Sequence, residues 1–353
     1  KRVDPDNLFN LNHLFMKPIK LILFLVATFL LAGTGMLLSP DNAATPVADH
    51  HVHVRSEAGT EALIKIMEKV KQQKGVEISD SAGADKVIAL LDSSGTEKAV
   101  LLSTAYFFSM PEVDFENEAD RVRQENEFVA RQAATYPDRL TAFCGLNPLS
   151  GYALKEIERC AEYNSVSGIK LQLANSAVDL RNEEHRKKMA KVFETADSHG
   201  LAIVIHLWTR NPDYGRKDVT LFIDDILSRA PNVPVQIAHM AGPGSFTEAT
   251  DRASAAFADA IAKDHPSMDK VWFDLAAVPA YPGAAKSKEE QEKIRETNRK
   301  IEQRIRQLGT DRILWGTDWI AGPTERYVKR MASIPLSNEI MEAIASNTAA
   351  YLE

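Results

Sequence analysis

Cysteine is scarce in this chain, with only Cys144 and Cys160 among 353 residues. Two cysteines cannot build a disulfide-rich scaffold, and their spacing does not match the paired cysteines of a zinc ribbon. One falls in a strand-like segment and the other in a helix-like segment. We therefore expect two packed thiols rather than a disulfide.

A basic stripe is also missing. The 42 Lys and Arg residues and 49 Asp and Glu residues are interspersed and give a net charge of −7. A nucleic-acid or other polyanionic partner would require a concentrated positive surface, so we expect a small-molecule substrate instead. A homo-oligomer is compatible with this composition.

Long hydrophobic runs are lacking except at the N-terminus. Lys17 and Lys20 precede an uncharged apolar stretch over residues 21–38, an arrangement typical of a secretory signal. The stretch is also near the minimum length for crossing a bilayer, so a retained anchor stays open beside a cleaved signal peptide. We predict a leader over residues 1–45, with the signal or anchor at 16–40. The protein would then be exported, either periplasmic or secreted, or anchored in a membrane through this segment alone.

The rest of the chain alternates between short β-rich runs and amphipathic segments with helical periodicity. This alternation indicates βαβ units, and eight of them predict an α/β fold, a (β/α)8 TIM barrel over residues 46–353. The expected strands cover residues 47–54, 98–103, 140–146, 168–173, 201–207, 233–239, 271–275 and 312–317.

Two loops interrupt this pattern. Residues 103–115 are aromatic and would either cover a helix or form an apolar wall of the substrate pocket. Residues 276–298 are long and polar, so they would form either an active-site lid or a solvated connection.

Metal-capable side chains stand where strands are expected to finish. In a TIM barrel these ends meet on the active-site face. His51 and His53 would share one face of their strand because side chains at i and i+2 point the same way. Zn²⁺ accepts nitrogen and oxygen ligands and in catalytic sites leaves a position for water. The predicted ligands are His51, His53, His206 and Asp318.

Two of these strand-end residues also suit proton transfer. Asp318 can act as both ligand and proton acceptor, while His239 would polarise the substrate oxygen or orient the water. Weaker candidates for substrate contact are Lys170, Trp208, Arg210 and Tyr106. Ordinary structural roles, such as an ion pair for Lys170 or solvation for Arg210, remain open alternatives.

The segments ADHHVHV, IVIHLWTR, QIAHMAG and RILWGTDW, with the closing SNTAAYL, resemble the amidohydrolase superfamily. The branch they resemble more closely includes aminocarboxymuconate-semialdehyde decarboxylase. This resemblance implies a TIM barrel with one divalent metal, usually zinc, on His51, His53, His206 and Asp318, with His239 as a catalytic histidine. In binuclear relatives, a carboxylated lysine at the position of Lys170 bridges two metals. We favour one metal, with Lys170 as a cation for a substrate carboxylate or for transition-state charge.

That branch contains hydrolases, decarboxylases and a hydratase, so the resemblance does not fix the reaction. The expected function is hydrolysis of a small amide, lactone or ester by a metal-activated water. The alternative is non-oxidative decarboxylation of an unsaturated or aromatic acid, which the pairing of His206 with Trp208 mildly favours. A metal-binding barrel without catalysis would leave Asp318 unexplained.

Overall fold

The computed structural model describes residues 44–70, 83–318 and 324–352. The predicted signal or anchor at residues 16–40 lies outside the described residues. Within them, none of the helices has both the length and the apolar character needed to cross a membrane.

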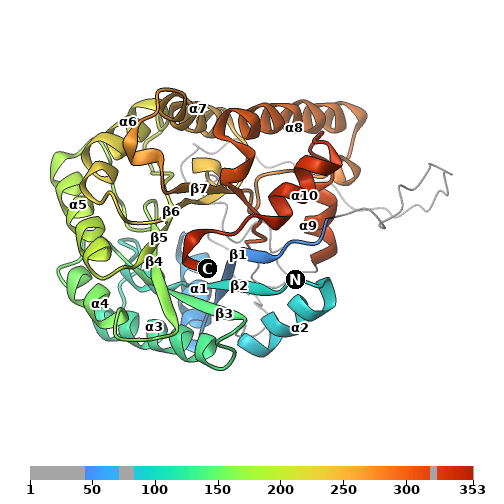
Figure 1. Cartoon of the computed structure of the whole chain (residues 1–353). Helices are drawn as coiled ribbons and strands as arrows, with labels where there is room; N and C mark the ends of the chain where they lie inside the picture. Colours follow the sequence, from blue (N-terminus) through green and yellow to red (C-terminus); the bar gives the residue numbers. More distant parts are fainter. Residues whose placement is uncertain (1–43, 71–82, 319–323, 353) are drawn as a thin grey trace.

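Eight parallel strands form one sheet in the order β1 to β8, and Figure 1 shows them at the centre of a ring of helices. The two ends of the sheet lie close together. One hydrogen bond shows this, since the backbone N–H of His50 in β1 donates to the carbonyl oxygen of Trp315, directly after β8, at 3.0 Å. This architecture confirms the predicted barrel, and all eight strands fall where the sequence placed them. They are β1 Ala48–Val54, β2 Lys98–Ser103, β3 Leu140–Leu146, β4 Val166–Gln172, β5 Ala202–His206, β6 Val235–Ile237, β7 Val271–Asp274 and β8 Ile313–Leu314.

The helices lie between and after these strands. Several begin at side chains that accept backbone N–H groups of the first turn, which satisfies donors that a helix leaves unpaired. Asn182, Thr247, Ser287 and Ser337 provide such caps. The helices are α1 Glu57–Val70, α2 Ala84–Ser94, α3 Glu118–Ala134, α4 Ala153–Cys160, α5 Glu183–Ser198, α6 Arg216–Asp225, α7 Glu248–Ala262, α8 Lys288–Leu308, α9 Thr324–Met331 and α10 Asn338–Ser346.

The hydrophobic core has separate parts. The largest cluster combines apolar residues of the strands and the surrounding helices, as in β/α barrels generally. A smaller cluster contains Val100, Leu102, Phe143 and Val204, and Tyr351 from the C-terminal turn packs against it. The C-terminal turn therefore contributes directly to the core.

The prediction of two packed thiols is wrong. Cys144 of β3 and Cys160 of α4 form a disulfide with a Cα–Cα distance of 6.5 Å. Both residues are buried in the main core cluster. The linear spacing gave no sign of this pairing. A βα unit folds its helix back over its strand, and this packing brings the two side chains together.

The aromatic loop after β2 forms the short helix η4, Ala105–Ser109. Its Tyr106, Phe107 and Phe108 are buried in a cluster that includes Leu63 of α1 and Val122 of α3. The packing supports the interpretation of this loop as a helix cover. The polar loop after β7 continues through η8, Pro282–Ala284, into α8.

Candidate metal centre and catalytic site

Three of the predicted ligands converge at the C-terminal ends of β1 and β8. His51 Nε2 lies 3.3 Å from His53 Nε2. Asp318 Oδ1 lies 3.3 Å from His51 Nε2 and 3.5 Å from His53 Nε2. Both histidines are buried, and only 10% of the Asp318 side chain is exposed. The three residues form a compact, almost enclosed group of potential ligand atoms.

Hydrogen bonds on the far side of each ring determine where its proton lies. His51 Nδ1 donates to Asp274 Oδ2 at 2.9 Å, and His53 Nδ1 donates to the carbonyl oxygen of Leu102 at 3.3 Å. In a neutral imidazole, the other ring nitrogen then carries a lone pair and no hydrogen. The contact between the two Nε2 atoms is therefore not a hydrogen bond, and two lone pairs and a carboxylate oxygen face one another.

A divalent cation fits this arrangement. In a tetrahedral site with bonds of about 2.0 to 2.1 Å, neighbouring ligand atoms lie about 3.3 to 3.4 Å apart. The distances among His51, His53 and Asp318 are 3.3, 3.3 and 3.5 Å. A cation would also remove the repulsion between the converging lone pairs.

The protonation states of these groups suit metal binding. Burial, followed by the positive charge of Lys170, lowers the pKa of His51 to about 3 against the opposing effect of Asp274. Burial raises the pKa of the Asp318 carboxyl, but His239 and His53 outweigh that effect and hold it below its usual range. The imidazole is therefore neutral and the carboxylate ionised at neutral pH, as ligands must be.

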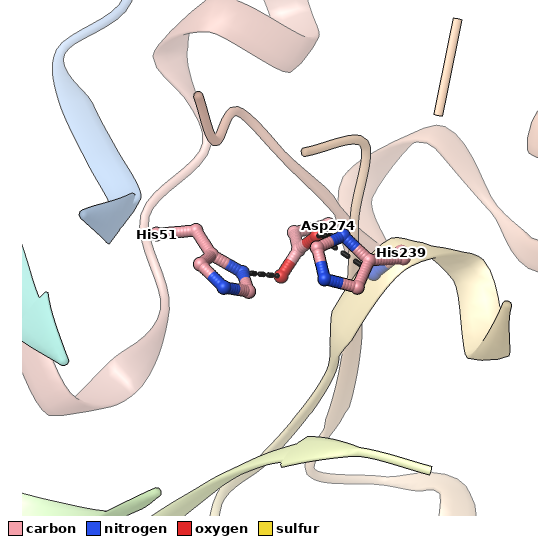
Figure 2. A group of neighbouring side chains, drawn as sticks. All are labelled: His51, His239 and Asp274. Carbon is pink, nitrogen blue, oxygen red and sulfur yellow. Dashed lines mark hydrogen bonds and ion pairs between the residues drawn. The ribbon is translucent and has the colours of Figure 1, made fainter. Parts of the chain in front are cut away.

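A second group joins His51, His239 and Asp274 (Figure 2). Asp274 Oδ2 accepts from His51 Nδ1 and, at 2.6 Å, from Gln236 Nε2. Its Oδ1 accepts from the backbone N–H groups of His239 at 2.8 Å and Ala276 at 3.1 Å. Because hydrogen bonds already satisfy both oxygens, this carboxylate orients His51 rather than binding an ion itself.

Asp274 was not among the residues predicted from the sequence. Burial raises the pKa of its carboxyl, but the charge and hydrogen bond of His51 outweigh this and lower the pKa below the usual range. The same signal that identified Asp318 was present, because Asp274 is the last residue of the apolar run Val271–Asp274.

The backbone around His239 is unusual. His239, Met240 and Ala241 have φ values of 55°, 51° and 67°, in the left-handed region that residues other than glycine seldom adopt. Asp318 shares this feature with a φ of 56°. Such conformations often cluster where a fold must place side chains for function.

This backbone also defines the hydrogen bonds of the His239 ring. His239 Nδ1 donates to the carbonyl oxygen of Ala276 at 2.7 Å, which leaves Nε2 as the acceptor in the neutral ring. The ring centroid lies 4.8 Å from those of both His51 and His206. His239 is therefore placed beside the predicted ligands, with an accepting nitrogen.

His206 is close to this group but belongs to neither set of converging ligand atoms. Its Nε2 is buried without a hydrogen-bond partner, and its Nδ1 lies 3.3 Å from Gln172 Nε2. Burial, followed by His239 and Lys170, lowers the pKa of His206 well below its usual value. A ligand role for His206 stays a prediction.

Gly316 is the residue that makes room for this packing. A Cβ at position 316 would lie 3.0 Å from His51 Cβ, 3.2 Å from Ala276 Cβ and 3.6 Å from Asp274 Cβ. A side chain there would press on His51 and on the carboxylate that orients it.

Lys170 lies among the same residues on β4. It is buried, and its Nζ is 3.5 Å from His51 Nε2. Burial lowers its pKa to about 8, against the attraction of Asp274 and Asp318. This position suits both roles considered for it, a cation at the reaction centre and a carboxylated bridge between two metals.

The remaining substrate-contact candidates have structural partners. Tyr106 is buried in the η4 cluster, and Trp208 packs against the main core. Arg210 forms an ion pair with Glu112, and its Nε donates to the carbonyl oxygen of Ala174 at 2.5 Å. Arg210 thus connects the loops after β2, β4 and β5, and substrate contacts for these three residues stay predictions.

Solved structures with the same fold include 5-carboxyvanillate decarboxylase from Sphingomonas paucimobilis. The TM-score is 0.56 and the identity 16%, over 86% of this chain and 97% of that one. The corresponding enzyme from Novosphingobium aromaticivorans is complexed with manganese and 4-hydroxy-3-methoxy-5-nitrobenzoic acid. Its TM-score is 0.53 and its identity 14%, over 88% of this chain and 96% of that one. A putative amidohydrolase from Staphylococcus aureus has a TM-score of 0.54 and 14% identity, over 87% of this chain and 98% of that one.

A search of curated proteins returns no significant match. The family model described as amidohydrolase matches residues 49–352, which include strands β2 to β8, all but the first residue of β1, and every ligand candidate. The chain therefore belongs to the amidohydrolase family.

Proposed function

We propose that this protein is a metal-dependent hydrolase that acts on a small amide, lactone or ester. The observation that carries the proposal is the convergence of His51 Nε2, His53 Nε2 and Asp318 Oδ1 at 3.3 to 3.5 Å, with both nitrogens unprotonated. His206 Nε2, buried and unpartnered, is the fourth proposed ligand. When bound, a zinc-like ion supplies Lewis acidity, which polarises a carbonyl group and makes water acidic near neutral pH.

The protein's own residues supply the proton transfers. The carboxylate of Asp318 remains ionised and can accept a proton from the attacking water. His239 Nε2 is the accepting nitrogen of its ring, so His239 orients the water rather than donating to the substrate oxygen. Of the two roles considered for His239, we therefore favour orienting the water.

We favour one metal per chain, with Lys170 acting as a cation. Its Nζ lies next to His51 Nε2, where a positive charge can stabilise an oxyanion that develops on the substrate. A second metal would require carboxylation of Lys170, which would replace this positive charge with a negative one.

Decarboxylation is the second candidate function. Three structures that share the fold at TM-scores above 0.5 are decarboxylases of an aromatic acid, and two of them hold manganese. The same His and Asp ligands would serve that reaction. His239 or Asp318 would transfer a proton to the substrate carbon that loses carbon dioxide. Manganese is accordingly the alternative to zinc.

Product analysis in ¹⁸O-labelled water separates the two reactions. Metal-loaded protein would be incubated with a panel of amides, lactones, and aromatic or enoic acids. Label that enters a new carboxylate supports hydrolysis. Release of carbon dioxide without that label contradicts our first choice and supports decarboxylation.

We also propose that the protein is exported. The predicted signal or anchor at residues 16–40, with its apolar stretch at 21–38, supports this, as does the Cys144–Cys160 disulfide, because such bonds persist mainly in oxidising compartments. Cell fractionation and N-terminal sequencing of the mature protein test it. A reduced protein in the cytoplasm that retains residues 16–40 would contradict it.

A further inference from the structure

The residue that follows β1 has no role in the proposed chemistry, yet its position is unusual. Arg55 is 0% exposed, and both of its terminal guanidinium nitrogens, Nη1 and Nη2, are buried without a hydrogen-bond partner. Leaving buried donors unpaired is costly, and more so for a charged group. A fully enclosed arginine with two unused donors indicates a missing anionic partner.

Arg55 follows the last residue of β1, two positions after His53. Continuing the extended backbone of the strand by one residue places the Arg55 side chain on the side of His51 and His53. Val54, between His53 and Arg55, packs in the main core on the opposite side. Two residues of strand advance the chain by about 7 Å, so Arg55 lies just beyond His53 toward the mouth of the barrel.

Other unpaired polar atoms lie in the same region. Among the described residues, buried side-chain atoms without a partner occur mostly at or just after the C-terminal ends of β1, β2, β4 and β5, and the others lie on α8. A polar molecule in the mouth of the barrel would give these groups partners. The atoms at the strand ends are Arg55 Nη1 and Nη2, Thr104 Oγ1, Asn175 Oδ1, Ser176 Oγ and His206 Nε2.

The neighbours of Arg55 fix the orientation of its guanidinium but do not accept hydrogen bonds from Nη1 or Nη2. Its Nε donates to Thr60 Oγ1 at 3.2 Å. Burial lowers the pKa of Arg55 to about 10, against the opposing charge of the nearby Glu125 carboxylate. That carboxylate already accepts hydrogen bonds from Ser56, whose backbone N–H donates to Oε1 at 2.9 Å and whose hydroxyl donates to Oε2. The guanidinium is therefore held in one orientation, and its Nη1 and Nη2 groups form a fork of two donors that can bind another group.

We propose that Arg55 binds a carboxylate of the substrate through this fork, so that the substrate class is a small carboxylic acid whose reacting group lies at His51, His53 and Asp318. A guanidinium recognises a carboxylate through two parallel hydrogen bonds, a geometry that lysine cannot reproduce. Burial raises the pKa of Tyr106, Asp318 raises it further and Arg55 opposes this, so the Tyr106 hydroxyl is close to both charged groups. The inference rests on the proposed function only for the position of the reaction centre.

The test is calorimetric titration of the full, zinc-loaded chain with isophthalate and glutarate. Their diamides, isophthalamide and glutaramide, serve as uncharged controls. In the wild type, at least one dicarboxylate should bind at least tenfold more tightly than its diamide. Arg55→Met should abolish this preference and weaken dicarboxylate binding at least tenfold, while zinc content stays unchanged. Arg55→Lys keeps the charge and should still weaken binding at least threefold.

A matched control is Arg186→Lys, because Arg186 of α5 forms an ion pair with Asp225 on the outside of the barrel. This variant should bind the dicarboxylates as the wild type does. Zinc content and the melting temperature identify any variant that fails to fold. If Arg55→Met does not fold, the comparison of Arg55→Lys with the wild type decides the test.

The competing explanation is that Arg55 only neutralises Glu125. In that case Glu125→Gln combined with Arg55→Met should restore wild-type dicarboxylate binding, which would overturn the proposal; continued weak binding in the double variant supports it. The proposal also fails if wild-type protein binds neither dicarboxylate, or if Arg55→Met and Arg55→Lys both bind them normally. Since these measurements do not depend on turnover, absence of hydrolysis leaves them interpretable.

Discussion

His51 Nδ1 donates a hydrogen bond to Asp274 Oδ2 at 2.9 Å, and this bond determines that the opposite nitrogen of His51 is the one available to a metal. Asp274 also accepts the backbone N–H of His239. One buried carboxylate therefore orients a proposed ligand and positions a proposed catalytic histidine.

The first prediction concerns this carboxylate. Asp274→Asn keeps the size of the side chain but removes the charge that holds His51 in its tautomer. We expect zinc affinity to fall about 10- to 100-fold, a typical cost of losing such a partner. Competition with a fluorescent chelator measures it. The exposed Asp269→Asn, on the loop before β7, is the control and should bind zinc normally; equal affinity in Asp274→Asn would contradict the orienting role.

Asp318→Asn separates metal binding from proton transfer. The amide retains an oxygen near His51 and His53 but cannot accept a proton, so turnover should fall by about 10²- to 10⁴-fold while part of the metal remains. Metal analysis and turnover on the same preparation provide the comparison. Wild-type turnover in this variant would show that Asp318 is not the proton acceptor.

His239→Asn tests the adjacent histidine. The asparagine amide can still donate to the carbonyl oxygen of Ala276, as His239 Nδ1 does, but nothing replaces Nε2. We expect full metal content and turnover lowered by about 10²- to 10⁴-fold. Unchanged turnover would exclude a catalytic role for His239.

A further prediction concerns the contribution of the disulfide to the free energy of unfolding. Replacing Cys144 and Cys160 with serine should lower the free energy of unfolding by roughly 3 kcal/mol, the usual contribution of a bridge that closes a loop of about 15 residues. Urea unfolding of the wild type with and without reductant should show a similar difference, with little change in metal content. Equal stability under both conditions would show that the bridge does not form in solution.

Much of the fold could be predicted because the local pattern and the final structure agree. Each strand is a short apolar run, and barrel closure brings the strand ends together, so His51, His53 and Asp318 could be identified by position alone. The orienting carboxylate Asp274 followed the same rule but went unassigned, since one acidic residue after a strand has no evident partner in the sequence.

Other features depend on packing that the linear pattern does not encode. The Cys144–Cys160 bridge requires the register of α4 on β3. Arg55 looks like an ordinary residue after a strand until its burial and its unpaired nitrogens are seen. The ion pair of Arg210 with Glu112 depends on loops whose paths are set by tertiary contacts.

The central claim is that His51, His53 and Asp318 hold a catalytic divalent ion. Elemental analysis of the purified wild type, His53→Ala and His206→Ala tests it most directly. We expect about one zinc-like ion per wild-type chain, and loss of both metal and activity in each variant. Two ions per chain together with a carboxylated Lys170 would refute the mononuclear assignment. A wild-type protein that holds no stoichiometric metal, even after incubation with zinc or manganese, would contradict the account as a whole.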